Sequence, residues 1–97
     1  MKQANHNIDS VIISSLLGYN PEMIGIFGSF ARNENTENSD IDILVRFKKS
    51  ISLLQLISIE NSLSNKLGIK VDLVTEGALK NRRLKNQIKK DLKVIYG

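Results

Sequence analysis

Hydrophobic and polar positions repeat with two different periods along this chain of 97 residues. A spacing of three to four residues places apolar side chains on one helix face, and it predicts helices over residues 8–17 and 52–67. Strict alternation places apolar side chains on one face of a strand, and it predicts strands over residues 40–47 and 70–74.

Weaker patterns complete the chain. Short apolar runs predict a buried strand over residues 23–27 and a short strand over residues 94–96. Residues 29–32 resemble the first turn of a short helix, and the polar residues 33–38 predict a loop. Apolar residues at helical spacing between positions 79 and 92 predict a broken or continuous helical region.

Glycine and proline mark the ends of the first two helices. We expect Gly18 and Pro21 to end the first helix and Gly68 to end the second, because glycine suits a helix C-terminus and proline cannot continue a helix. The elements predict an α/β (α+β) fold with a small mixed β-sheet, one face of which the helices cover. We expect residues 1–97 to form a single domain without a separate substrate domain.

Composition narrows the chemistry. Hydrophobic residues make up 41% of the chain and charged residues 25%, as in ordinary soluble domains. We expect a cytoplasmic protein, because no apolar stretch is long enough to span a bilayer and the N-terminus lacks the features of a signal peptide. The chain has no cysteine and one histidine, so any metal would be held by oxygen ligands, which favours Mg²⁺, Mn²⁺ or Ca²⁺.

The net charge of +4 is concentrated near the C-terminus. Seven basic residues are opposed in this segment only by Asp91: Lys80, Arg82, Arg83, Lys85, Lys89, Lys90 and Lys93. Such a segment can face phosphates, nucleic acid or an acidic partner. Taken alone, it is better explained as the solvated face of a helix.

Asp40 and Asp42 are the first candidates for a functional site. Residues two apart in a strand share a face, so both carboxylates project side by side. Their mutual repulsion does not favour folding unless a cation lies between them, and a divalent ion meets that need. The pair alone is equally consistent with an acidic strand that faces solvent.

Asp72 favours the functional interpretation. It alternates with Val71 and Leu73 in a strand that we expect to neighbour the strand of Asp40 and Asp42. In suitable register, three carboxylates share one sheet face, an arrangement that matches a two-metal site for phosphoryl transfer.

Gly28 and Ser29 follow the buried strand and predict a phosphate site. Glycine lets the backbone approach a ligand closely, and the unpaired N–H groups of a helix start attract phosphate. Arg32 lies one turn further on, within reach of a phosphate oxygen. On this evidence alone, a serine N-cap beside a surface arginine is the better explanation.

Together these segments resemble the motif of the nucleotidyltransferase superfamily that includes DNA polymerase β. The resemblance rests on Gly-Ser-Phe-Ala-Arg at residues 28–32, Ser-Asp-Ile-Asp at residues 39–42 and Val-Asp-Leu-Val at residues 71–74, and it covers nearly the whole chain. It is strongest to the minimal nucleotidyltransferase (MNT) domains. Asn33 replaces a glycine that is frequent in the family, and we expect the turn to survive because asparagine tolerates left-handed conformations.

The resemblance implies a polymerase β-like fold and a role for each site residue. Asp40 and Asp42 would bridge two Mg²⁺ ions, and Asp72 would help to hold the catalytic ion and activate the attacking hydroxyl. Gly28 and Ser29 would hold the β- and γ-phosphates of ATP, with Arg32 as a weaker candidate for the same task. Ser39 would cap the loop by a hydrogen bond.

The resemblance also implies a partner. MNT proteins occur as antitoxins beside HEPN ribonuclease toxins, and they would neutralise the toxin by transferring AMP from ATP to a tyrosine. One alternative is an antitoxin that neutralises its partner by binding alone. Another is nucleotidyl transfer to RNA or to a small molecule, although direct nucleic-acid binding is not expected for this chain.

Overall fold

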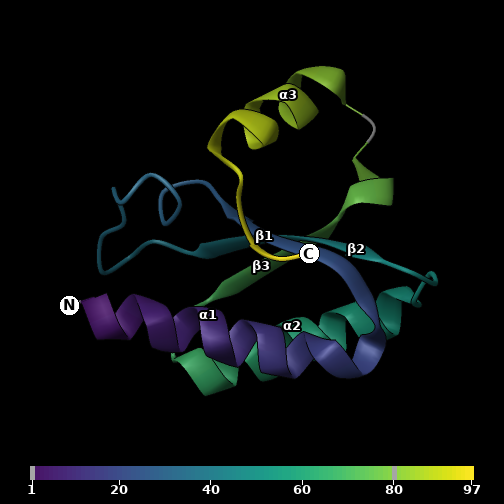
Figure 1. The fold of residues 1–97 in the computed structure, drawn as a ribbon, viewed down its shortest axis with the longest axis horizontal. Coiled ribbons are helices and arrows are strands. Elements are labelled where there is room, and N and C mark those ends of the chain that lie inside the picture. The colour runs from purple at the N-terminus through teal and green to yellow at the C-terminus, as the bar shows by residue number, and fades with distance from the viewer. Residues whose placement is uncertain (1, 80) are drawn as a thin grey trace.

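The computed structural model describes residues 2–79 and 81–97, and the side chains from residue 8 onward, so Lys80 lies outside the described residues. The chain forms three α-helices, two 3₁₀ helices and four strands within that range (Figure 1). In chain order they are α1 (Lys2–Leu16), η1 (Leu17–Tyr19), β1 (Pro21–Phe27), β2 (Ile41–Phe47), α2 (Leu53–Leu67), β3 (Val71–Thr75), η2 (Glu76–Ala78), α3 (Arg82–Asp91) and β4 (Lys93–Tyr96).

The four strands form one sheet in the order β3-β2-β1-β4. β2 and β3 are parallel and are joined by α2, whereas β1 pairs antiparallel with both β2 and β4. The predicted mixed sheet and all four predicted strands are therefore confirmed.

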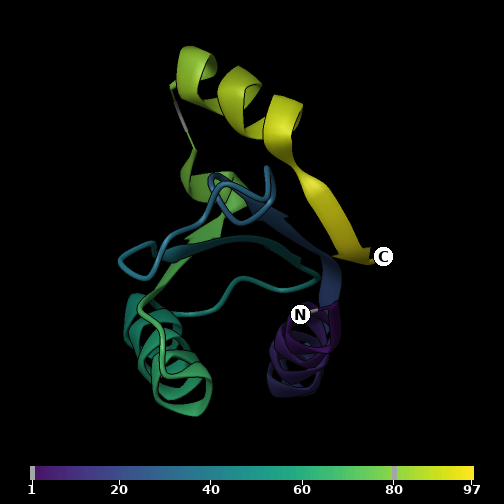
Figure 2. The same ribbon diagram turned by 90° about the vertical axis from the view of Figure 1, so that its left-hand side faces the viewer.

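The helices cover both faces of the sheet, so the prediction that they cover one face is wrong. α1 and α2 pack on one side and α3 on the other (Figure 2). The cause is Leu44, which alternation places on the face of Asp42 but which is only 3% exposed. It forms a second small core with Met23 and Ile88 of α3. Burial of this cluster holds α3 above the sheet.

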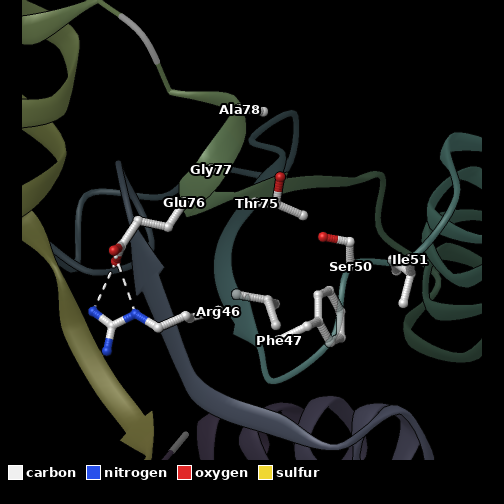
Figure 3. Close-up of a pocket in the computed structure, with 9 residues that line it drawn as sticks. Arg46, Phe47, Ser50, Ile51, Thr75, Glu76, Gly77 and Ala78 are labelled. Carbon is white, nitrogen blue, oxygen red and sulfur yellow. Dashed lines mark hydrogen bonds and ion pairs between the residues drawn. The ribbon is translucent and has the colours of Figure 1, made fainter.

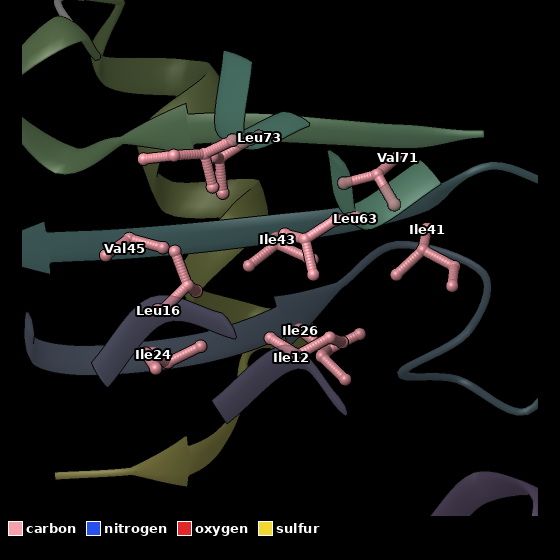
Figure 4. Packing of buried hydrophobic residues seen from close by; sticks show 11 residues of the cluster. Ile12, Leu16, Ile24, Ile26, Ile41, Ile43, Val45, Leu63, Val71 and Leu73 are labelled. Atoms are coloured by element: carbon pink, nitrogen blue, oxygen red, sulfur yellow. The ribbon is translucent and has the colours of Figure 1, made fainter. Parts of the chain in front are cut away.

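The main core lies between the sheet and the α1–α2 layer (Figure 4). Ile41, Ile43 and Val45 of β2 point into it, and each is fully buried, as their alternation predicts. At the outer edge of β3, the side chain of Glu60 in α2 accepts a hydrogen bond from the Leu73 amide at 2.7 Å. This contact closes one edge of the sheet to further pairing.

The helix ends mostly follow the sequence. Ser52 forms a capping box with Gln55, and Gly68 ends α2 in a left-handed conformation with φ 67°, as expected. The first helix is different: η1 follows it, and the left-handed residue is Asn20, with φ 56°, not Gly18. α1 also begins six residues earlier than predicted; the prediction missed residues 2–7 because, apart from Ala4, they are polar and show no apolar period.

Residues 29–32 do not form the predicted helix. They make a single hydrogen-bonded turn, in which the Arg32 amide donates to the Gly28 carbonyl at 3.1 Å. Asn33 then adopts a left-handed conformation with φ 59°, which stops helix growth and confirms that asparagine is tolerated there. Residues 34–40 continue as a loop to β2. None of the described helices is long and apolar enough to cross a membrane.

Candidate active site

Asp42 and Asp72 lie side by side on the sheet. In the parallel ladder of β2 and β3, Asp42 is the register partner of Asp72, so both side chains leave the same face. That face is the one over which α3 packs, since Leu44 lies two residues further along β2. Asp40 directly precedes β2 and lies close enough to Asp42 to act on its charge.

The electrostatics of Asp42 reflect this crowding. Its side chain is half-buried, whereas Asp40 and Asp72 are exposed. Burial raises the pKa of the Asp42 carboxyl, and repulsion from Asp72 and then Asp40 raises it further. Arg32 opposes the rise. The protein itself does not fully neutralise the negative charge of the three carboxylates. A cation bound here would offset their repulsion and favour the ionised form of Asp42.

The spacing of the three carboxylates does not by itself define a metal site. Among the described residues, no group of three or more His, Cys, Asp or Glu side chains is spaced to hold a metal ion. The structure brings the three residues to one end of one sheet face, and their role as metal ligands stays a prediction.

The Gly28–Ser29 turn borders the carboxylates. Phe27, the last residue of β1, is the register partner of Asp42, so the chain enters the turn directly beside that carboxylate. Gly28 has φ 77°, and a Cβ atom added there would collide with Oδ2 of Asp42. Glycine is therefore required twice, for its backbone conformation and for the space that the carboxylate occupies.

The turn offers backbone donors to a ligand. Its internal hydrogen bonds use the amides of Arg32, Asn33 and Glu34. Within the described residues, the amides of Ser29 and Phe30 donate to no other backbone carbonyl. Successive amides of this kind suit an anion, although a single turn contributes little helix dipole.

Arg32 points to acidic side chains. Its Nε donates to Glu34 at 2.8 Å and its Nη1 to Asp91 of α3 at 2.6 Å. Both bonds raise the pKa of the guanidinium, with the Glu34 bond the larger cause. Arg32 thus ties the Gly28–Ser29 turn to the end of α3, a link over 59 residues that no sequence pattern indicates.

Ser39 caps the loop, as expected, because its Oγ accepts a hydrogen bond from the Thr36 amide at 2.8 Å.

A separate pocket of about 540 Å³ opens at the opposite end of β2 and β3 (Figure 3). Its wall includes Phe47, Ile51 and Thr75, together with Arg46 and Glu76, whose side chains pair at 2.9 Å. None of the six predicted site residues lines it. The sequence did not indicate this pocket, because its walls come from the ends of elements that are separated along the chain.

Known proteins are similar to this chain in sequence. The family model described as "Nucleotidyltransferase domain" matches residues 11–95. A protein of Methanocaldococcus jannaschii, named as a candidate protein adenylyltransferase, is 54% identical over 74 residues, which cover 76% of this chain and 76% of that protein. The protein adenylyltransferase MntA of Thermococcus cleftensis is 45% identical over 73 residues, which cover 75% of this chain and 71% of that protein.

Solved structures share its fold. A chain in a crystal structure of a toxin–antitoxin with AMP-PNP matches with a TM-score of 0.84 and 26% identity, covering 92% of this chain and 73% of that chain. A chain from a complex of tri-AMPylated Shewanella oneidensis HEPN toxin with MNT antitoxin matches with a TM-score of 0.79 and 24% identity, covering 100% and 73%. These matches confirm the fold that the sequence motif implied.

Proposed function

The chain belongs to the nucleotidyltransferase domain family, and from this membership we propose that it is a protein adenylyltransferase that acts as the antitoxin of a HEPN toxin. The observation that carries the proposal is the register of Asp42 with Asp72 beside the turn that begins at Gly28. This arrangement places acidic side chains next to backbone donors, which is what a triphosphate and its counter-ions require.

The reaction is transfer of AMP to a hydroxyl, with a tyrosine of the partner as the acceptor. The hydroxyl oxygen forms a bond to the α-phosphorus of ATP, the bond from that phosphorus to the bridging oxygen breaks, and pyrophosphate leaves. Asp72 is exposed, so a partner can bring its hydroxyl within reach and Asp72 can accept the proton. Ser29 and its amide neighbours bind the β- and γ-phosphates and orient the leaving group.

The donor set fits Mg²⁺. Asp40, Asp42 and Asp72 offer only carboxylate oxygens, the ligands that this ion prefers. Burial, followed by repulsion from Asp72 and Asp40, raises the pKa of Asp42, and a cation at that place would oppose the rise. When bound, Mg²⁺ would neutralise charge on the phosphates and on the attacking and leaving oxygens. We assign two ions to the site by the resemblance of the motif.

Arg32 has a secondary role in this scheme. Its guanidinium is held by Glu34 and Asp91, so it must leave at least one of them to contact a phosphate. Arg32 and Glu34 are exposed and Asp91 is partly exposed, so solvent screens both pairs and their exchange for a phosphate contact costs little free energy.

The acceptor protein docks on the α3 side of the sheet, because the carboxylates lie on that face. α3 exposes Arg82, Arg83, Lys89 and Lys90, a basic surface that would attract an acidic partner.

The test uses the purified chain, ATP, Mg²⁺ and the protein encoded by the adjacent gene. Intact-mass analysis of the partner should show a gain of one or more AMP units. Asp42→Asn should abolish the gain, whereas Asp9→Asn, the same change on α1, should not. If Asp42→Asn still neutralises the toxin fully, the chain acts by binding alone and the catalytic proposal is wrong.

A further inference from the structure

The parallel strands β2 and β3 end side by side, and the chain leaves their carboxyl ends in opposite directions. After β2 it continues through residues 48–52 to α2 on one face of the sheet, and after β3 it continues through η2 to α3 on the other face (Figure 2). In open α/β sheets, the crevice between two such diverging connections is the usual place for a ligand. The pocket of about 540 Å³ lies in this crevice, and its volume is within the range of small-molecule sites.

The outer edge of β3 presents backbone amides that side chains of α2 accept. The Val71 amide donates to Oγ of Ser64 at 3.0 Å. The Leu73 amide donates to the carboxylate of Glu60 at 2.7 Å. Because alternate residues of an edge strand direct their N–H groups to the same side, the amide of Thr75 faces outward as well.

The Thr75 amide has no acceptor of this kind. Ser64 and Glu60 are one helical turn apart on α2, so the residue in line with Thr75 is Leu56, whose side chain cannot accept a hydrogen bond. Within the part of the chain that the structure describes, no loop carbonyl and no side chain accepts from the Thr75 amide. Thr75 lines the pocket, so this N–H is left as a donor for a ligand.

Two hydroxyl groups lie beside this amide. Ser50 and Thr75 both line the pocket, and neither hydroxyl forms a hydrogen bond with another described residue. In Figure 3 the hydroxyl of Ser50 points towards Thr75. Phe47 and Ile51 supply apolar surface to the same pocket. The pocket therefore combines a group of hydrogen-bond donors with an apolar wall.

The charges around the pocket favour an anion. Glu76 in its wall is already neutralised, because its two carboxylate oxygens accept from Arg46 at 3.3 and 2.9 Å. The hydrogen bond from Arg46 lowers the pKa of Glu76, and the positive charges of Lys85 and Lys89 lower it further. The exposed lysines at residues 48–49 follow β2 directly. Positive charge thus reaches the pocket from β2, from the loop that follows it and from α3.

We propose that this pocket binds a small carboxylate that carries an apolar group. The carboxylate accepts hydrogen bonds from the Thr75 amide and from the hydroxyls of Thr75 and Ser50, and hydrogen bonds to a charged acceptor are stronger than neutral ones. The apolar group packs against Phe47 and Ile51 and is removed from water. The site lies at the end of β2 and β3 remote from the three aspartates, so this inference does not depend on the proposed transfer reaction.

The first test is an NMR titration of the ¹⁵N-labelled chain with 3-phenylpropionate, without ATP, metal or a partner protein. The amide signal of Thr75 should shift to saturation together with those of residues 47–51, and the signals of Gly28 and Ser29 should not move. Acetate lacks the apolar group and 3-phenylpropanamide lacks the charge, so each should bind roughly tenfold more weakly or worse. The proposal is overturned if the Thr75 signal does not shift, or if acetate or the amide binds as tightly as 3-phenylpropionate.

The second test removes one hydroxyl at a time. Thr75→Val and Ser50→Ala change the shape of the pocket little, and each should raise the Kd for 3-phenylpropionate roughly three- to tenfold. Ser62→Ala is the matched control, since Ser62 is exposed on α2 and does not line the pocket, and its affinity should equal that of the wild type. Thermal unfolding checks that all three variants are folded. Wild-type affinity in both pocket variants, or an equal loss in Ser62→Ala, would contradict the assignment.

Discussion

Replacing Asp42 by asparagine should stabilise the protein while it removes the proposed activity. Asp42 makes no hydrogen bond or ion pair within the described residues, so the substitution removes charge without removing a native contact. Its register partner is Asp72, and directly opposed residues on neighbouring strands lie about 5 Å apart. At that separation two unit charges repel by roughly 1 kcal/mol in water and by about 3 kcal/mol at an effective dielectric constant of 20.

The lower figure applies, because Asp72 is exposed and solvent screens the pair. We expect Asp42→Asn to raise the free energy of unfolding by about 1 kcal/mol at pH 7 without divalent metal, a rise in Tm of about 4–8 °C for a domain of this size. Asp9→Asn on α1 is the matched control and should change Tm much less. Mg²⁺ should reduce the difference in Tm between Asp42→Asn and the wild type, because a bound cation offsets the repulsion in the wild type.

The pH dependence of the stability gain is a second test of the electrostatic argument for Asp42→Asn. Burial, then Asp72 and Asp40, hold the pKa of Asp42 above its ordinary value of 3.8 in the folded protein. The folded state therefore binds this proton more tightly, and the wild type loses stability as pH rises from about 3.8 through the raised pKa. The advantage of Asp42→Asn should be complete above that window and should shrink as pH falls towards 4.

The assay is thermal unfolding of both proteins in EDTA from pH 4 to pH 8, repeated with Mg²⁺. A Tm for Asp42→Asn equal to or below that of the wild type at pH 7 would refute the electrostatic argument. A gain that stayed constant down to pH 4 would refute it as well, because the effect would then arise from packing.

Three further substitutions test individual contacts. Gly28→Ala should cost about 1–2 kcal/mol of stability from left-handed backbone strain and also weaken nucleotide binding, measured by calorimetric titration with ATP, since the methyl group displaces the neighbouring carboxylate. Asp91→Asn should change Tm by only a few degrees yet bind ATP several-fold more tightly, because it releases Arg32 to contact a phosphate; unchanged or weaker binding would contradict this role of Arg32. Glu60→Ala should lower the unfolding free energy by about 1.5–3 kcal/mol in urea titration, because it leaves the Leu73 amide without its charged acceptor.

The sequence alone determined the local features of this protein. Alternation in β2 fixed which side chains enter the core and which face Asp42 shares, because successive residues of a strand point to opposite faces. The end of α2 at Gly68 and the left-handed turn at Asn33 followed from the conformations that these residue types tolerate. Each of these features depends on a few neighbouring residues, which is why a pattern in the chain reveals it.

Only the tertiary structure decided which distant segments meet. It placed α3 on the second face of the sheet through Leu44, and it paired Arg32 with Asp91 across 59 residues. It also directed Glu60 of α2 to the edge of β3, where its carboxylate accepts a hydrogen bond from the Leu73 amide. These outcomes depend on how whole elements pack and close the intervening loops, and the free energy of that packing is not encoded in the period of any single segment.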